Sequence, residues 1–241
     1  MSILTGVDIE KVLFLDIETV PAFPAYSEMP EHWQDLWAEK TKWQRGEETT
    51  AEEYYPQRAG IMAEFGKIIC ISVGFIKGKG EELTFRVRSF YGEDEKVLLE
   101  EFADLLNKFF SSASHYLAAH NGKEFDFPYI ARRMVVNRVS IPNLLDSAGK
   151  KPWEVTHIDT MELWKFGDRK NFSSLKLLAA LLDIPTPKDD MDGSMVGPVF
   201  WQEKDLERIR IYCQKDTLAV AQLLLRFHGG SLIKPEQVIE V

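Results

Sequence analysis

Cysteine, positive charge and long apolar runs are all scarce in this sequence. Its 241 residues include two cysteines, Cys70 and Cys213, which lie far apart within apolar segments. Two such thiols do not make the disulfide framework of a small secreted protein, and they predict buried, reduced cysteines and a cytoplasmic location. No apolar run approaches the ~20 residues that span a bilayer, and the N-terminal segment lacks the features of a signal peptide, so we expect no membrane association.

The shortage of basic side chains bears on the partners of the protein. Lys and Arg number 29 against 38 Asp and Glu, which gives a net charge of −9. This balance argues against an ordinary nucleic-acid binder, because phosphate backbones are bound largely through Lys and Arg. Acidic groups that hold cations are the exception, since bound metal ions dominate the charge of their site.

The composition that is present indicates one well-packed domain. Hydrophobic residues make up 45% and charged residues 28%, as is typical of soluble globular proteins, and we expect residues 1–241 to form a single domain. Within it, residues 22–63 are rich in Trp, Tyr and Glu with partly helical spacing, which predicts a helical insertion. Its aromatic side chains either pack in a core or stack on unpaired bases. Residues 230–241 are expected to form a loosely held tail.

The order of hydrophobic patterns predicts an α/β fold. Short β-rich runs predict strands at 11–20, 67–77, 82–91, 115–120 and 155–158. Helical periodicity predicts helices at 94–110, 125–137, 173–182 and 203–227, with Asp94 and Ser173 as N-caps. Three antiparallel strands followed by parallel crossover strands predict a mixed sheet that is flanked by helices.

The first predicted strand carries two acidic residues. Asp16 and Glu18 are two positions apart, so their side chains point to one face while Leu15 and Ile17 point to the other. Two like charges beside a hydrophobic run repel each other unless solvent or a cation compensates them, and hard divalent cations prefer oxygen ligands. A metal site and simple hydration at a strand end are both consistent with this pair.

Two other acidic positions are also ambiguous when taken singly. Asp126 follows the strand at 115–120 and begins a helix, at the kind of sheet edge where ligands gather, although an acidic residue there also complements the helix dipole. Tyr212 and Asp216 are four residues apart in the last predicted helix, so the hydroxyl and the carboxylate share one face. That spacing is common in purely structural helices.

Other polar residues give weaker signals. Asp159 follows the strand at 155–158 and is expected to cap the next helix. The histidines lack the spacing of a zinc site or of a catalytic triad, and we expect them to be structural or solvated. They are His32, His115, His120, His157 and His228.

Together, the acidic clusters resemble the three exonuclease motifs of the DEDD superfamily. The motifs occur in the family's order between Val12 and Phe227: Asp16-x-Glu18, Asn121-x-x-x-Phe125-Asp126 and Tyr212-x-x-x-Asp216. Ile211 occupies the position where the histidine subtype has its His, so the match is to the tyrosine subtype. Further similarity at 174–185 and 192–196 narrows it to predicted 3′→5′ exonucleases related to the editing domain of B-family DNA polymerases.

This resemblance implies a ribonuclease-H-like fold and a 3′→5′ exonuclease that uses two divalent cations, Mg²⁺ or Mn²⁺, to release nucleoside 5′-monophosphates. The implied metal ligands are Asp16, Glu18, Asp126 and Asp216. Tyr212 would orient the attacking water. Asn121 and Phe125 would contact the terminal nucleotides, although a Phe packed beside a polar turn is an equally good interpretation.

The resemblance also implies a nucleic-acid 3′ end as the partner, with single-stranded or frayed DNA favoured. RNA is an alternative, because exclusion of the 2′-hydroxyl depends on pocket shape rather than on a local motif. A second alternative is a non-catalytic nucleic-acid-binding module on the same fold. The acidic net charge favours this interpretation, whereas the presence of all four carboxylates and of Tyr212 argues against it. No polymerase domain follows the motifs, so we expect a free-standing enzyme or one with a separate polymerase or repair partner.

Overall fold

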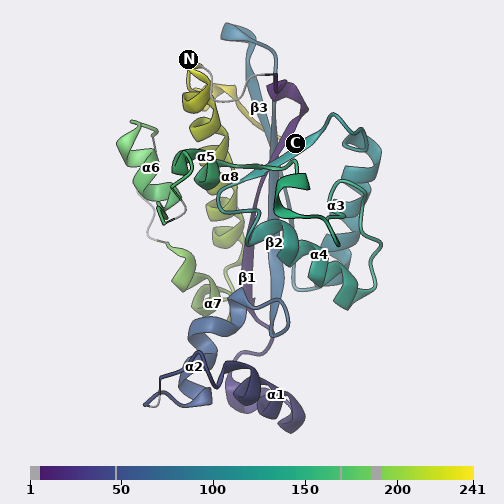
Figure 1. Ribbon diagram of the computed structural model, residues 1–241, viewed down its shortest axis with the longest axis vertical. Coiled ribbons are helices and arrows are strands. Elements are labelled where there is room, and N and C mark those ends of the chain that lie inside the picture. The colour runs from purple at the N-terminus through teal and green to yellow at the C-terminus, as the bar shows by residue number, and fades with distance from the viewer. Residues whose placement is uncertain (1–5, 47, 169, 186–190) are drawn as a thin grey trace.

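The centre of the molecule is a mixed sheet. The computed structural model describes residues 6–46, 48–168, 170–185 and 191–241 (Figure 1). Its strands are β1 (Val12–Pro21), β2 (Gly66–Lys77), β3 (Thr84–Tyr91), β4 (Tyr116–Ala119), β5 (Ile158–Asp159) and β6 (Val238–Glu240). They are ordered β5-β4-β1-β2-β3-β6, with β1, β2 and β3 antiparallel and the pairs β1–β4, β4–β5 and β3–β6 parallel. The predicted ribonuclease-H-like mixed sheet is confirmed.

Helices cover both faces of this sheet. They are α1 (Glu31–Thr41), α2 (Ala51–Arg58), α3 (Glu95–Phe109), α4 (Asp126–Asn137), α5 (Thr160–Lys165), α6 (Leu175–Leu181), α7 (Val196–Pro198) and α8 (Leu206–His228). Helices α3 and α4 lie on one face, and α8, with α5 and α6, lies on the other (Figure 1). None of the helices in the described ranges combines the length and apolar character needed to cross a bilayer.

The alternation of side chains in β1 separates two hydrophobic cores. Leu15 and Ile17 belong to the core under α3 and α4, whereas Phe14 belongs to the core under α8. Since successive side chains of a strand point to opposite faces, Asp16 and Glu18 share the face of Phe14. Both carboxylates are therefore directed toward the layer that contains α8.

One helix cap differs from the prediction. Helix α6 begins after Ser174, whose Oγ accepts a hydrogen bond from the Leu177 N–H at 3.2 Å, and not after Ser173. Ser173 has other partners, because its hydroxyl donates to Asn171 Oδ1 at 3.0 Å and its carbonyl is bonded by His120 at 2.8 Å. The serine that the sequence pattern favours as the cap is thus engaged by Asn171 and by the distant His120, and its neighbour Ser174 caps the helix.

Residues 22–63 leave the sheet between β1 and β2, and α1 and α2 project beyond its end (Figure 1). Here Trp37 is fully buried, with its ring centroid 5.3 Å from that of Tyr55 and 5.0 Å from that of Phe65. In contrast, Trp43 is 90% exposed. The aromatic residues of this segment therefore divide between a small separate core and the surface.

The C-terminal tail is held in place, contrary to the prediction. Residues Val238–Glu240 form β6, which extends the sheet beside β3. The side chain of Gln222 on α8 both donates to the Ile233 carbonyl and accepts from the Ile233 N–H, each at 2.8 Å. The pairing of β6 with β3 satisfies backbone groups that β3, as an edge strand, would otherwise leave open, and it stabilises the docked tail.

Glu95 connects α3 to α4 through a buried ion pair. Arg133 Nε and Nη2 lie 2.8 and 2.5 Å from the two Glu95 carboxylate oxygens, and both residues are less than 10% exposed, at 8% and 7%. The Ile68 N–H donates to the same carboxylate at 2.7 Å, and Arg133 Nη1 donates to the Ala63 carbonyl at 2.8 Å. The pair thus fixes both helices to the beginning of β2.

Removing the cation of this pair should be costly. In Arg133→Met the Glu95 carboxylate remains buried without its partner, so the free energy of unfolding in urea should fall by about 3 to 5 kcal/mol. The matched control is Lys108→Met, which removes an exposed pair with Asp104 at 3.1 Å and should change stability by less than about 1 kcal/mol. Equal losses in the two variants would contradict the assigned role of Glu95.

Candidate active site

Asp16 and Glu18 lie where β1 loses one of its neighbours. In the described ranges β4 pairs with β1 only from Val12 to Phe14, so the β4-facing edge of β1 is open from Asp16 onward. On its other edge, the register with β2 shifts between Glu18 and Thr19, as in a β-bulge. Bulges change the direction of nearby side chains and are frequent beside functional sites. Glu18 is only 6% exposed, and Asp16 is partly buried.

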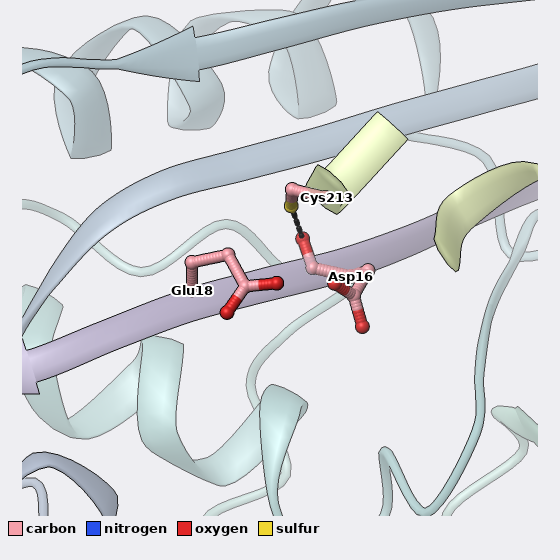
Figure 2. A group of neighbouring side chains, drawn as sticks. All are labelled: Asp16, Glu18 and Cys213. Carbon is pink, nitrogen blue, oxygen red and sulfur yellow. Dashed lines mark hydrogen bonds between the residues drawn. The ribbon is translucent and has the colours of Figure 1, made fainter. Parts of the chain in front are cut away.

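Cys213 of α8 packs against this part of β1. Its thiol donates to the Asp16 carbonyl with an Sγ–O distance of 3.3 Å (Figure 2). One side-chain ligand atom from each of Asp16, Glu18 and Cys213 lies within 4.8 Å of the others. Burial raises the pKa of the Cys213 thiol well above its usual value, so it remains neutral at physiological pH. In the metal-free protein the thiol is thus engaged by the backbone, and the hard ligand atoms of this group are the carboxylate oxygens.

The structure brings the four predicted carboxylates together. Burial, and then the charges of Glu18, Asp216 and Asp126, raise the pKa of Asp16 well above its usual value. Burial, followed by the charge of Asp216, does the same to the pKa of Glu18. Burial also raises the pKa of Asp126 to about 7, against the opposing effect of backbone N–H groups that include Ile17 of β1. A buried group of like charges needs a counter-charge before all its members can ionise together.

One oxygen of this group has no protein partner. Asp16 Oδ2 is buried and accepts no hydrogen bond among the described residues. An unsatisfied buried acceptor costs free energy, and a carboxylate oxygen in this state is a natural ligand for a hard divalent cation. Because the available donors are carboxylate oxygens, the group fits Mg²⁺ or Mn²⁺ better than soft metals.

Tyr212 and Asp216 converge on the same place from α8, as their spacing predicts. The Tyr212 hydroxyl donates a hydrogen bond to Asp216. Burial, and then the charges of Asp216, Glu18 and Asp16, raise the pKa of Tyr212 far above its usual range. The phenol is therefore neutral at any physiological pH, and it can position a neighbour by hydrogen bonding but cannot act as a base.

Asp159 holds the turn that leads to Asp126. The backbone N–H groups of Asn121 and Lys123 donate to its two carboxylate oxygens at 3.0 and 3.1 Å. Asn121 has a left-handed backbone with φ of 64°, which Asn adopts more readily than most residues. Asp159 also caps α5 by accepting two N–H groups of its first turn, at 2.9 and 3.2 Å. The predicted cap is confirmed, and the same side chain fixes the approach to α4.

The two predicted substrate contacts differ in their surroundings. Asn121 lines a cavity at the C-terminal ends of β4 and β5. Phe125 is partly buried and packs beside Tyr129, with ring centroids 5.3 Å apart, at the margin of the core under α3 and α4. Packing therefore accounts for much of the Phe125 side chain.

Sequence reasoning missed Cys213 as a wall of the site and His120 as a support for it. His120 Nδ1 lies 2.9 Å from Thr160 Oγ1 and so ties the end of β4 to α5. The signal for Cys213 was its place between Tyr212 and Asp216 on one helix, which puts it close to the carboxylates. His120 had no local signal, since its partners are 40 and 53 residues away.

Comparison with known proteins adds a family to this geometry. A family model described as a predicted 3′-5′ exonuclease related to the exonuclease domain of PolB matches residues 61–233. The match includes Asp126, Tyr212 and Asp216, and it begins after Asp16 and Glu18, which β1 brings to the same place by pairing with β2. A search of curated proteins finds no match to the chain.

The raised pKa of Asp126 predicts the response of the metal-free protein to pH. Ionisation of Asp126 is disfavoured in the folded state, so its contribution to stability is present at low pH and is lost as the pH rises through about 7. In EDTA, Asp126→Asn should therefore gain stability relative to the unsubstituted protein as the pH rises from about 5 to about 8, as measured by thermal melting.

Two comparisons make this result specific. The control Asp104→Asn alters an exposed carboxylate on α3 and should shift the melting temperature about equally at both pH values. Adding Mn²⁺ at the higher pH should stabilise the unsubstituted protein more than Asp126→Asn, because cations that bind only the folded state stabilise it. Parallel melting curves for both carboxylate variants at all pH values would contradict the raised pKa of buried Asp126.

Proposed function

Because this chain belongs to the family of predicted 3′-5′ exonucleases related to the exonuclease domain of PolB, we propose that it removes nucleotides from the 3′ end of DNA by metal-assisted hydrolysis. The observation that carries this proposal is the group of four carboxylates in which burial raises the pKa values of Asp16, Glu18 and Asp126, with the charge of Asp216 contributing to the first two. A group of this kind has little structural benefit without cations. The 3′-to-5′ direction of this proposal comes from the family, and its metal assistance comes from the carboxylates.

We assign Asp16, Glu18, Asp126 and Asp216 to hold two divalent cations, Mg²⁺ or Mn²⁺. Exonuclease domains of this kind generally use divalent metals, and the unpartnered Oδ2 of Asp16 supports a ligand role in this chain. When bound, such cations activate water and stabilise the charge that develops on the leaving oxygen.

In this proposal, Tyr212 orients the attacking water. Its proton is engaged by Asp216, so the phenol oxygen is left to accept a hydrogen bond from the water. Because the phenol stays neutral, it contributes direction and no charge. Asn121, in the turn fixed by Asp159, would hold the terminal nucleotide through its side-chain amide, and Phe125 would contact it at the edge of the core.

Single-stranded or frayed ends of DNA are the substrates that we propose. With a net charge of −9 the protein has few basic side chains to spare for the phosphates of a long duplex. A strand end beside Asp16, Glu18, Asp126 and Asp216 would need fewer such contacts, because divalent cations held there would supply the positive charge for the scissile phosphate.

A product ladder tests this function. Labelled single- and double-stranded DNA and RNA should be incubated with Mg²⁺, Mn²⁺ or EDTA, and the products resolved by length. We expect 5′-labelled single-stranded DNA to shorten one nucleotide at a time with either cation and to stay intact in EDTA or with Asp216→Asn. Faster loss of RNA would reassign the substrate, and cleavage in EDTA would overturn the mechanism.

Tyr212→Phe should slow the reaction by about 10- to 10³-fold, which is less than the typical 10²- to 10⁴-fold contribution of a group that transfers the proton itself, because the neutral phenol only orients the water. The phenyl ring keeps the packing, while the oxygen that would receive the water is lost. The rate should be measured under single-turnover conditions, with the melting temperature as a check on folding. Tyr91→Phe, which alters an exposed tyrosine on β3, is the control and should keep the original rate. A folded Tyr212→Phe enzyme with full activity would remove Tyr212 from the mechanism.

A further inference from the structure

Two of the four carboxylates also border a thiol. One ligand atom from each of Asp16, Glu18 and Cys213 lies within 4.8 Å of the others, and Glu18 and Cys213 are 6% and 0% exposed. In Figure 2 the Cys213 thiol reaches from α8 to the segment of β1 that carries both carboxylates. The proposed function uses the carboxylates and leaves this thiol without a chemical role.

A second thiol lies next to the first. Cys70 of β2 is the register partner of Glu18, and it packs in one buried cluster with Cys213. The two thiols are linked by a hydrogen bond, and neither is part of a disulfide. The surroundings of Glu18 therefore offer sulfur as well as oxygen.

Sulfur changes which cations this place selects. Carboxylate oxygens suit Mg²⁺ and Mn²⁺, whereas thiolates select softer ions such as Zn²⁺. Zinc accepts Cys together with Asp or Glu in a tetrahedron with bonds of about 2.0 to 2.3 Å, so its ligand atoms lie about 3.5 Å apart. Atoms that already lie within 4.8 Å of one another need only small side-chain movements to reach that spacing.

Asp16 offers an entering ion a coordination position. Its Oδ2 is buried and accepts no hydrogen bond among the described residues, while the residue as a whole is partly exposed and gives access from solvent. The Cys213 thiol is bonded to the Asp16 carbonyl, at 3.3 Å, and not to either carboxylate. Because S–H is a weak donor, a bond from sulfur to a metal ion would replace only a weak interaction.

We propose that Asp16, Glu18 and Cys213 form a zinc site, and that zinc bound there switches the nuclease off. On binding, a Zn–S bond replaces the S–H bond and the proton goes to solvent, with no change of oxidation state, because a coordinating thiol is deprotonated by its metal. Asp16 and Glu18 would then be unable to hold the two hard cations with Asp126 and Asp216. The inhibition rests on the proposed function, whereas the zinc site itself does not.

Cobalt substitution tests the site without any hydrolysis. The full chain should be freed of metals with EDTA, desalted and titrated with Co²⁺, which takes the place of zinc and gives a near-ultraviolet charge-transfer absorption when a thiolate binds it. We expect this absorption to appear and to be abolished by Zn²⁺. Cys213→Ser keeps a donor for the Asp16 carbonyl and should lose the absorption, whereas the matched control Cys70→Ser should retain it.

Melting temperatures should show that both serine variants are folded. If the folded, unsubstituted protein gives no charge-transfer absorption with Co²⁺, the zinc site is overturned. Loss of the absorption in Cys70→Ser alone would overturn the assignment of Cys213 as the sulfur ligand.

Zinc inhibition tests the consequence for catalysis. Degradation of single-stranded DNA in excess Mg²⁺ should be followed as Zn²⁺ is added, with each protein compared with its own rate without zinc. The zinc concentration that halves the rate should be at least about 10-fold higher for Cys213→Ser, since even the loss of a residue that only supports a metal ligand costs about 10- to 100-fold in affinity. Equal zinc sensitivity in Cys213→Ser and Cys70→Ser would overturn the inhibition. The cobalt titration needs no nuclease activity, so the zinc site and the proposed function are tested independently.

Discussion

The rest of the structure has to hold four carboxylates close together despite their mutual repulsion. They are Asp16, Glu18, Asp126 and Asp216. Left to themselves, four carboxylates in one partly buried space would separate or take up protons. Here each is fixed by an element that is anchored elsewhere: β1 by its two hydrophobic faces, α4 by the Glu95–Arg133 pair, and α8 by a long apolar side. The cores on either side of the sheet therefore supply the free energy that keeps the charges together.

The same constraint explains the lesser polar contacts around the site. Asp159 accepts four backbone N–H groups and so fixes both the turn before α4 and the start of α5. The Cys213 thiol satisfies the Asp16 carbonyl without adding charge. Such contacts hold a preformed geometry, which matters because a metal site that must first be ordered binds its cations less tightly.

Much of this arrangement could be predicted from the sequence, and for physical reasons. The apolar alternation of β1 determines which face carries Asp16 and Glu18, and the Asp94 cap of α3 is a local signal that the structure confirms. Strand β6 and the contacts of His120 with Thr160 and Ser173 could not be predicted, because each depends on partners distant in the chain. A strand of three residues has almost no pattern of its own, and a histidine that ties two elements together looks, in sequence, like any other histidine.

The insertion between β1 and β2 has a consequence for the order in which the chain folds. These two strands are neighbours in the sheet, yet residues 22–65 separate them, so their pairing has to close a long loop rather than a tight turn. Loop closure costs entropy that rises with loop length, and structures rich in distant contacts fold slowly. The small core around Trp37 shortens the effective loop if it forms early. On this view β1, which carries Asp16 and Glu18, pairs with β2 late, and the four carboxylates come together only after the chain around them has folded.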